Sequence, residues 1–353
     1  MPQRRTKKDS HHIKIFDTTL RDGQQCPGAG MSFNNNIEYA RLACDLRVDV
    51  LEAGFPAASN LDFEIVRTIT DEIIHLDYQP VVAALCQLRE QQVIRTIEAL
   101  HPLIASQHAR VHIYVPVDPD LMPISLGELS KNKKQIVSDL ARFTKIAVDA
   151  GCEVEFSPEG YSRMRENFDF TTELFRATVQ NGGTVINCPD TIGGACQIQG
   201  KEYFVEKMNK HAALMAKEFP DKSITWSTHC HNDFGLAVQN SINAVFSGPA
   251  RQIEGCINGT GERAGNAALE QCIMLIKQFG TSTDPENPFY TTIDISKLQA
   301  ISDFVSKNML PRQPHWPISG DNAAKHSSGG HTNAILKNPL AYQPFDPGQS
   351  SPL

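Results

Sequence analysis

The stretch Ile13-Lys-Ile-Phe-Asp-Thr-Thr-Leu-Arg-Asp-Gly-Gln-Gln25 begins with a short apolar run and ends in a cluster of polar residues. A longer amphipathic segment, residues 34–46, follows it and predicts a helix. This succession of apolar run and amphipathic segment repeats eight times, at intervals of roughly 25 to 40 residues, which is typical of parallel βα units. The sequence therefore predicts an α/β protein.

The expected strands are short and mostly apolar, like the buried strands of a covered sheet. They span residues 13–16, 50–54, 81–85, 111–115, 153–156, 185–187, 225–228 and 252–256. The expected helices span residues 34–46, 62–76, 90–100, 130–150, 171–181, 201–219, 236–246 and 266–279. Eight units over residues 12–280 match a (β/α)8 TIM barrel, which typically has about 250 residues. An open sheet alternates similarly, but no G-x-G-x-x-G turn follows the first strand, and this favours a closed barrel.

Two segments of different composition flank the expected barrel. Residues 1–11 carry a basic cluster, and we expect a flexible N-terminus there. Residues 281–353 are rich in proline and contain one expected helix, 295–308, so we expect a C-terminal linker or lid segment. Its Ser327-Ser-Gly-Gly330 stretch resembles a flexible linker, yet His326 and His331 beside it are residues that a pure linker does not need.

Composition disfavours several classes of function. The 353 residues include 33 Lys and Arg against 40 Asp and Glu, a net charge of −7 that disfavours nucleic-acid binding. The longest apolar run, residues 81–86, is far shorter than the roughly 18 residues of a membrane span. The nine cysteines form no C-x-x-C pair. We therefore expect reduced thiols in a cytoplasmic protein that binds neither nucleic acid nor membranes.

Polar residues gather after the expected strands, where a barrel enzyme builds its site. His229 and His231 end the seventh strand two residues apart, so both imidazoles point to the same face. Asp22 follows the first strand and Asn266 follows the eighth. These four side chains are candidate ligands of one divalent cation, Mn²⁺, Mg²⁺, Co²⁺ or Zn²⁺, with open positions for substrate oxygens.

Each ligand also has a simpler interpretation. An H-x-H pair alone is more often a solvated or core pair, Asp22 suits a helix cap or a loop salt bridge, and Asn266 suits a helix N-cap. The placement of the pair opposite Asp22 favours the metal. Since imidazoles bind cations only when neutral, we expect the affinity to fall as the pH drops through about 6.

Three further residues at the strand ends are candidates for substrate chemistry. Arg21, otherwise an ordinary surface arginine, is suited to hold a carboxylate or a developing oxyanion. Glu159 and Thr191 follow the fifth and sixth strands, and each is equally compatible with a loop cap. Gly259-x-Gly261 is a weak phosphate-binding signal, and we expect instead a backbone turn that places Asn266.

Four segments resemble the metal-dependent barrels that make or break C–C bonds next to a carbonyl, and within that superfamily most resemble the 2-isopropylmalate synthases. They are FDTTLRDGQQCPGAG (16–30), EAGFP (52–56), HCHNDFG (229–235) and NGTGERAGNAALE (258–270). In the C-terminal segment, HSSGGH (326–331) and YQPFDP (342–347) resemble the S-G-x-H and tyrosine segments of those synthases.

The resemblance implies a condensation in which the methyl carbon of acetyl-CoA adds to the ketone of a 2-oxo acid and the thioester is hydrolysed. It implies that the cation binds the 2-oxo acid, that Arg21 stabilises the forming alkoxide and that Thr191 holds the carboxylate. Glu159, His331 and Tyr342 would move the acetyl proton, with the base left open. The resemblance also implies a pocket for the substrate side chain, lined by His112, Ser157 and Pro189.

The resemblance further implies a homodimer in which His331 and Tyr342 of one chain complete the partner's barrel; a tail folded onto its own barrel is the alternative. We expect an apolar 2-oxo acid such as 2-oxoisovalerate, because Glu155 stands where homocitrate synthases commonly have an arginine for a second carboxylate.

The sequence also departs from the synthases. His331 is followed by Thr332-Asn333 where the family often has Gln-Asp, and Tyr114-Val-Pro-Val-Asp118 replaces a small polar segment. Because the chain stops at Leu353, we expect no regulatory domain and no leucine inhibition. Citramalate, homocitrate or citrate synthases, a C–C lyase or aldolase, and a weak truncated barrel that needs a partner remain alternatives.

Overall fold

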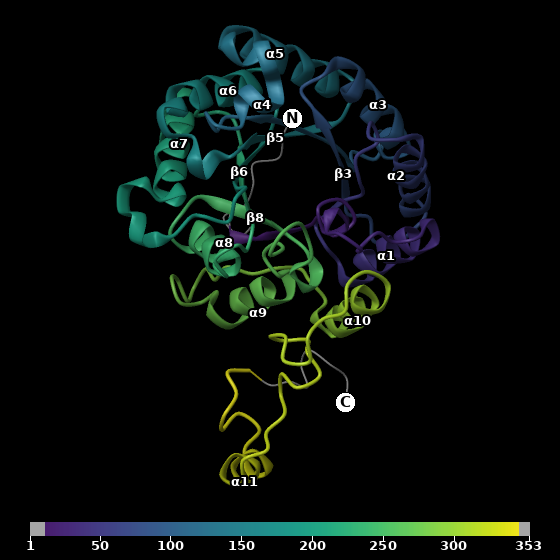
Figure 1. The fold of residues 1–353 in the computed structure, drawn as a ribbon, viewed down its shortest axis with the longest axis vertical. Coiled ribbons are helices and arrows are strands. Elements are labelled where there is room, and N and C mark those ends of the chain that lie inside the picture. The colour runs from purple at the N-terminus through teal and green to yellow at the C-terminus, as the bar shows by residue number, and fades with distance from the viewer. Residues whose placement is uncertain (1–10, 346–353) are drawn as a thin grey trace.

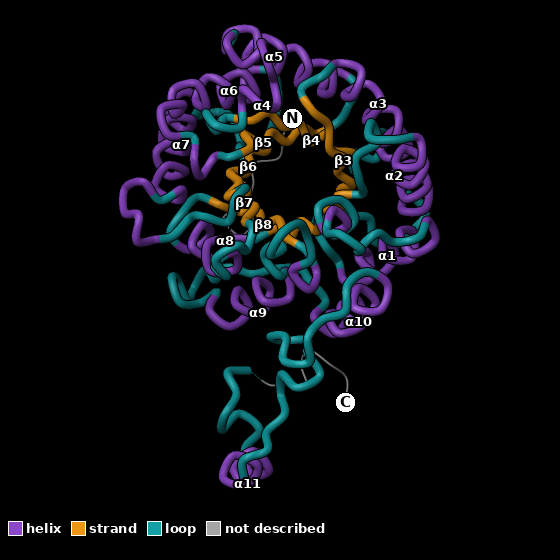
Figure 2. Tube along the Cα trace, in the orientation of Figure 1, coloured by secondary structure: helices purple, strands orange, loops and turns teal. Residues whose placement is uncertain are grey.

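The computed structural model describes residues 11–345, and its centre is a closed barrel of eight parallel strands (Figures 1 and 2). The strands are β1 (Lys14–Asp17), β2 (Val50–Glu52), β3 (Val81–Gln87), β4 (Ala109–Pro116), β5 (Glu153–Glu159), β6 (Val185–Asp190), β7 (Thr225–Cys230) and β8 (Ala250–Gly255). β1 pairs with both β2 and β8, and the register of Lys14 with Gln252 closes the ring. The predicted (β/α)8 barrel is confirmed.

Helices surround the strands in chain order. They are α1 (Phe33–Leu46), α2 (Asn60–Ile73), α3 (Glu90–Leu100), α5 (Lys133–Asp149), α6 (Phe168–Gln180), α7 (Phe204–Glu218), α8 (Ala237–Phe246) and α9 (Leu269–Phe279), with a short α4 (Met122–Leu126) before α5. In α2 the buried Val66, Ile69 and Ile73 recur at helical spacing and face the barrel core. Within residues 11–345 we find no helix with the length and apolar character of a membrane span.

Several helices begin later than the sequence pattern predicts, and for α9 and α5 the structure shows a local reason. α9 begins at Leu269 rather than at residue 266, because Asn266 and Ala268 form bridges with His231 and Cys256 and are held extended. α5 begins at Lys133 rather than at residue 130, because the Asn132 side chain accepts the hydrogen bond that caps the helix.

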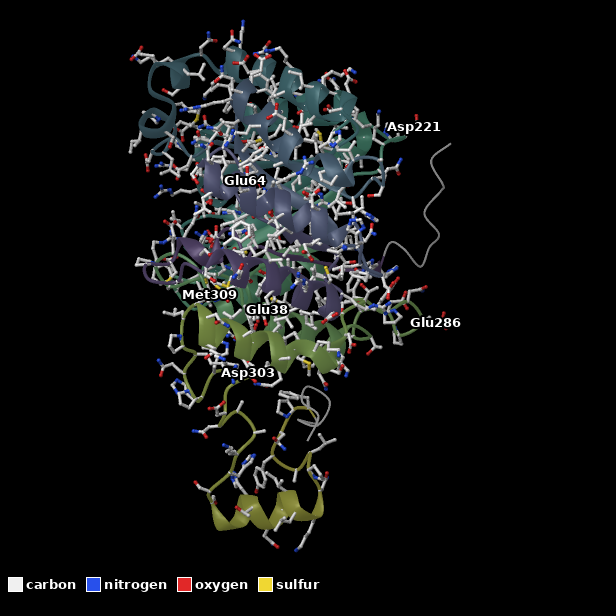
Figure 3. All side chains as sticks on the ribbon, turned by 90° about the vertical axis from the view of Figure 1, so that its right-hand side faces the viewer. Glu38, Glu64, Asp221, Glu286, Asp303 and Met309 are labelled. Atoms are coloured by element: carbon white, nitrogen blue, oxygen red, sulfur yellow. The ribbon has the colours of Figure 1, made fainter. Side chains whose placement is uncertain are left out.

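The C-terminal segment divides into a packed part and a separate part. The expected helix is present as α10 (Leu298–Asn308), which packs on α1 with the Phe304 and Tyr39 rings 6.2 Å apart. Helix α11 (Gly329–Lys337) lies away from the barrel in both views and begins inside the expected flexible linker (Figures 1 and 3). The expected flexible N-terminus lies, except for residue 11, outside the described residues.

One buried carboxyl group fastens the segment after α10 to the barrel. Glu270 accepts a hydrogen bond from Trp316 Nε1 at 2.7 Å and another from the Asn258 backbone N–H at 3.1 Å. Burial raises the pKa of Glu270, and these donors offset part of that effect. Trp316 also approaches Gly259, in the loop that leads to Asn266. The extended segment is thus anchored directly to the β8–α9 loop.

We predict that Trp316→Phe lowers the free energy of unfolding by about 1 to 3 kcal/mol, because it keeps an aromatic side chain but removes the indole N–H that donates to Glu270. Urea unfolding measures the change. His315→Ala, at the exposed neighbouring residue, is the control and should shift stability by no more than about 0.5 kcal/mol. Equal stability of the two variants would show that the hydrogen bond does not fasten this segment.

Candidate functional site

A pocket opens at the carboxyl ends of the strands, and most of the residues singled out from the sequence line it. The lining residues are Arg21, Asp22, Gln25, Phe55, Leu85, His112, Tyr114, Ser157, Glu159, Asn187, Pro189, Thr191, His229, His231, Glu254, Glu262 and Arg263. They come from all eight βα units, because parallel strands bring their carboxyl ends to the same face of the barrel.

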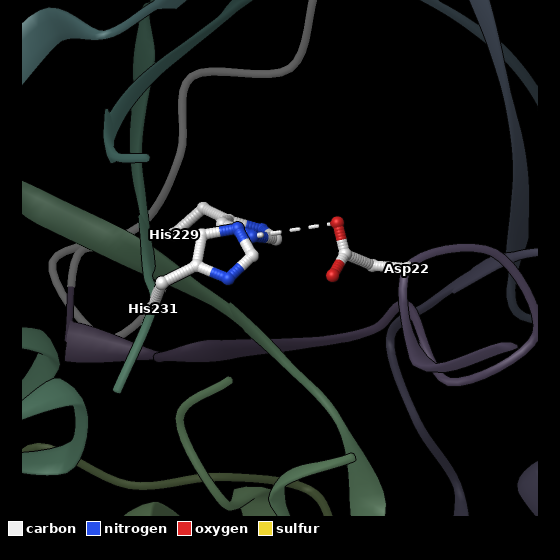
Figure 4. A group of neighbouring side chains, drawn as sticks. All are labelled: Asp22, His229 and His231. Atoms are coloured by element: carbon white, nitrogen blue, oxygen red, sulfur yellow. Dashed lines mark ion pairs between the residues drawn. The ribbon is translucent and has the colours of Figure 1, made fainter. Parts of the chain in front are cut away.

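Asp22, His229 and His231 meet at one side of this pocket (Figure 4). All three are buried, and one potential ligand atom from each lies within 4.8 Å of the other two. Nε2 of His229 is 3.8 Å from Oδ2 of Asp22. Asp22 stands in the turn after β1, so the structure brings together side chains that are more than 200 residues apart in sequence.

The fourth candidate ligand, Asn266, completes this group. Its Nδ2 donates to Oδ1 of Asp22 at 2.6 Å and to the Thr260 carbonyl at 2.9 Å, while its buried Oδ1 has no hydrogen-bond partner. Gly261, with φ of +147°, passes so close that a Cβ there would lie 2.2 Å from Nδ2 of Asn266. The glycine turn therefore positions Asn266, as the sequence predicts.

The donors present fit a divalent cation. The buried Oδ1 of Asn266 has no hydrogen-bond partner among the described residues, and mixed imidazole and oxygen donors suit first-row divalent ions. Burial raises the pKa of Asp22, but the charge of Arg21, helped by the hydrogen bond from Asn266, holds the pKa well below its usual range. Asp22 is thus ionised at neutral pH.

Both imidazoles are held neutral in the absence of a cation. Burial lowers the pKa of His229, and it is also the main reason that the pKa of His231 falls to about 4. The expected loss of cation affinity near pH 6 rested on an unperturbed histidine pKa and is corrected. Protons compete for these nitrogens only at more acidic pH.

Arg21 is held by two carboxylates rather than exposed at the surface. Its Nε donates to Oε2 of Glu52 at 2.6 Å and its Nη1 to Oδ2 of Asp22 at 2.5 Å. Burial raises the pKa of Glu52, but the charges of Arg21 and His112 outweigh it and bring the pKa to about 2. The contacts of Arg21 with Glu52 and Asp22 leave its Nη2 without a hydrogen-bond partner among the described residues, so Nη2 remains available to a substrate.

Hydrogen bonds connect the polar residues of the pocket floor to one another. His112 contacts Glu52 through Nδ1 at 2.7 Å and Ser157 through Nε2 at 2.6 Å, and Asn187 Nδ2 donates to Ser157 Oγ at 2.8 Å. His112 and Ser157 are pocket residues that the resemblance implies, whereas no role was expected for Glu52 or Asn187. The inward period of two along each strand is the signal that selects Asn187, two residues before Pro189.

Glu155 lies in the barrel interior and is not among the residues that line the pocket, which corrects the role expected for it. It is fully buried and pairs with Nη1 of Arg110 at 2.8 Å. Repulsion by Glu155 is therefore not a reason to expect an apolar substrate. Its carboxyl lies within 4.8 Å of His112 and Glu254, but these groups already pair with protein side chains and form a hydrogen-bonded core.

Thr191 and Glu159 both line the pocket. Oγ1 of Thr191 accepts a hydrogen bond from the Gly160 backbone N–H at 2.8 Å, and its hydroxyl proton stays free to donate. Burial and the charge of Asp118 raise the pKa of Glu159. A carboxyl group with a raised pKa is the better proton acceptor, which agrees with the expected proton-transfer role.

His331 and Tyr342 do not reach the pocket of their own chain. They lie in and after α11, where their rings stack with centroids 3.8 Å apart. Nδ1 of His331 is 3.4 Å from Nδ1 of His326, and Tyr342 is 53% exposed. The alternative in which the tail folds onto its own barrel is therefore not the arrangement of this structure.

We predict that the protein binds one Mn²⁺ per chain and that a His229→Ala/His231→Ala variant does not, because two of the neutral nitrogen donors are lost. Isothermal titration calorimetry measures both. The affinity should persist through pH 6 and decline as the pH approaches about 4, where His231 becomes protonated. His326→Ala is the control and should bind normally. Stoichiometric binding by the double variant would contradict the assignment.

Comparison with solved structures supports the fold. HMG-CoA lyases from Bacillus subtilis and from Acinetobacter baumannii, the latter in complex with coenzyme A and 3-methylmalate, resemble this chain with TM-scores of 0.65 and 0.67. They are 15% and 17% identical to it, and the matches cover 86% and 92% of this chain and 96% and 100% of theirs.

Comparison with curated sequences gives a closer likeness. 2-Isopropylmalate synthases of Aromatoleum aromaticum and Neisseria meningitidis serogroup B are 38% and 37% identical to this chain over 94% and 95% of it. The chain spans about 60% of the length of both relatives. The model of the HMGL-like family matches residues 12–305, which include the whole barrel and most of α10. By that match, the chain belongs to the HMGL-like family.

Proposed function

We propose that the chain is a cytoplasmic acyltransferase that condenses acetyl-CoA with 2-oxoisovalerate and water to form 2-isopropylmalate and CoA, a step of leucine biosynthesis. The observation that carries the proposal is the group of Asp22, His229 and His231 beside Arg21 at one side of a pocket. The likeness to curated 2-isopropylmalate synthases supports the choice of reaction.

The residues of the pocket suit the groups of a 2-oxo acid. Asp22, His229, His231 and Asn266 would hold a divalent cation, which supplies Lewis-acid polarisation of the ketone when bound. The free Nη2 of Arg21 would donate to the ketone oxygen as negative charge develops there, and the Thr191 hydroxyl would donate to the carboxylate. His112 and Ser157 would border the substrate beneath.

The pocket wall favours an apolar substrate side chain. Phe55, Leu85, Tyr114 and Pro189 contribute apolar surface to it. The Arg110 guanidinium, fully buried in the barrel, is already paired with Glu153 and Glu155, so it offers no partner for a second substrate carboxylate. Burying an unpaired substrate carboxylate against this apolar wall would cost free energy. We therefore expect 2-oxoisovalerate for this reason, and no longer because of repulsion by Glu155.

Residues of the barrel and of the tail would carry out proton transfer in the proposed reaction. A base removes a proton from the acetyl methyl group, the new C–C bond forms at the ketone carbon, and the ketone oxygen takes up a proton. Water then hydrolyses the thioester and releases CoA. Glu159 lines the pocket and its pKa is raised, so it is suited to move the first proton together with His331 and Tyr342 of a partner chain.

We predict Mn²⁺-dependent thiol release from acetyl-CoA, with kcat/KM for 2-oxoisovalerate exceeding that for 2-oxoglutarate by roughly tenfold or more. A thiol-release assay with a panel of 2-oxo acids measures this, and mass spectrometry identifies the product. The His229→Ala/His231→Ala variant serves as the inactive control. A preference for 2-oxoglutarate, or cleavage of a hydroxy acid to pyruvate or acetyl-CoA without condensation, would overturn the proposed reaction.

We propose in addition that the working unit is a homodimer in which the tail of one chain completes the barrel of the other. The separation of α11 from its own barrel supports this arrangement (Figure 3). Leu336, Leu340 and Tyr342 are exposed on the tail, and burial against a partner would remove this apolar surface from water.

Co-expression of an Arg21→Ala chain with a His331→Ala chain tests the exchange. In an exchanged mixed dimer one site carries both defects and the other carries neither. Random pairing makes about half of the dimers mixed, so we predict recovery of about a quarter of the wild-type activity. A chain with both substitutions is the control and should stay inactive. No recovery above the single variants would rule out the exchange.

A further inference from the structure

A buried carboxyl group on β8, Glu254, stands directly behind one of the candidate metal ligands. It is 1% exposed, and its Oε2 lies 3.3 Å from Nδ1 of His229. No motif in the sequence points to Glu254. Its position follows from the inward period of two on β8, and β8 is the neighbour of β7, which carries His229.

The two ring nitrogens of His229 face different groups. Nε2 lies 3.8 Å from Asp22, on the side of the other candidate ligands, whereas Nδ1 lies towards Glu254. A cation at this site needs the Nε2 lone pair, so the proton of the neutral ring must be on Nδ1. A carboxylate behind Nδ1 favours that tautomer. Nδ1 of His229 lacks an aligned hydrogen bond, but Oε2 of Glu254 lies within hydrogen-bonding distance of it.

Glu254 is itself held by hydrogen-bond donors from neighbouring strands. Ser227 Oγ donates to its Oε1 at 2.7 Å, and Asn187 Nδ2 donates to its Oε2 at 3.2 Å. Gln252 Nε2 lies 3.4 Å from Oε1. Three donors around one carboxyl group orient it as an acceptor. No described residue plays the same part for His231, whose buried Nδ1 has no hydrogen-bond partner.

We propose that Glu254 is a positioning residue that fixes the tautomer and orientation of His229 for the divalent cation. The inference rests on the proposed metal site. Carboxylate partners of metal-binding histidines set which nitrogen carries the proton and strengthen the ligand, and their removal typically costs 10- to 100-fold in metal affinity. Glu254 is thus held by Ser227 and Asn187, and it in turn orients His229 towards the site.

Glu254→Gln tests the proposal, since the amide keeps the shape but replaces a carboxylate oxygen with a group that can donate. At pH 8 we expect Mn²⁺ to bind roughly 10- to 100-fold more weakly in calorimetry. In the cation-free protein labelled with ¹⁵N-histidine, the His229 resonances should move from the Nδ1–H towards the Nε2–H tautomer. The His231 resonances should not change.

Glu153→Gln is the matched control, because it makes the same change at the other end of the barrel, where Glu153 pairs with Arg110. It should bind Mn²⁺ within twofold of the wild type. If Glu254→Gln does not fold, Ser227→Ala removes only the closer of the two donors to Oε1, and the His229 tautomer should shift in the same direction.

Two results would overturn the proposal: Mn²⁺ affinity in Glu254→Gln within twofold of the wild type, or His229 resonances that do not change. A loss of affinity that Glu153→Gln reproduces would also overturn it. Failure of the metal site itself is a different outcome, because the wild type would then bind no Mn²⁺, whereas the spectrum of the cation-free protein still reports on the contact between Glu254 and His229.

Discussion

The barrel buries charged side chains, and each buried charge needs a partner of opposite sign. Arg21 pairs with Glu52 and Asp22 near the mouth, and Arg110 pairs with Glu153 and Glu155 deeper in the barrel. A buried charge without a partner would cost several kcal/mol, so each guanidinium determines where its carboxylates lie. These pairs replace part of the apolar packing that ordinarily fills a TIM barrel.

The same pairs prepare the pocket for chemistry before any substrate arrives. Glu52 joins Arg21 to His112, and Ser157 and Asn187 continue the hydrogen bonds towards Glu254 and His229. Side chains that are held on several strands lose little further freedom on binding, and such preorganised donors are the main source of electrostatic stabilisation in enzymes. The polar residues of the pocket are therefore oriented before the substrate binds.

The segment after the barrel has two different relations to it. α10 packs on α1, and Trp316 reaches Glu270, so this part is tied to the loop that carries Asn266. α11 has no buried residue and carries the ring stack of His331 and Tyr342 away from the pocket. A helix that buries no apolar face gains little stability from the rest of its own chain, which agrees with a role in contact with a second copy.

The barrel could be predicted from sequence because apolar runs and helical periods are local signals. The shared face of His229 and His231 could also be predicted, because side chains two residues apart on a strand point to the same side. The sequence indicated Asp22, Arg21 and Asn266 through their places after strands. Three contacts became visible only in the folded chain: Glu52 pairs with Arg21, Glu254 lies behind His229, and Glu155 pairs with Arg110 instead of lining the pocket. These contacts join strands that are separated by tens of residues, and the barrel's closure and register, rather than any local pattern, set which inward side chains meet.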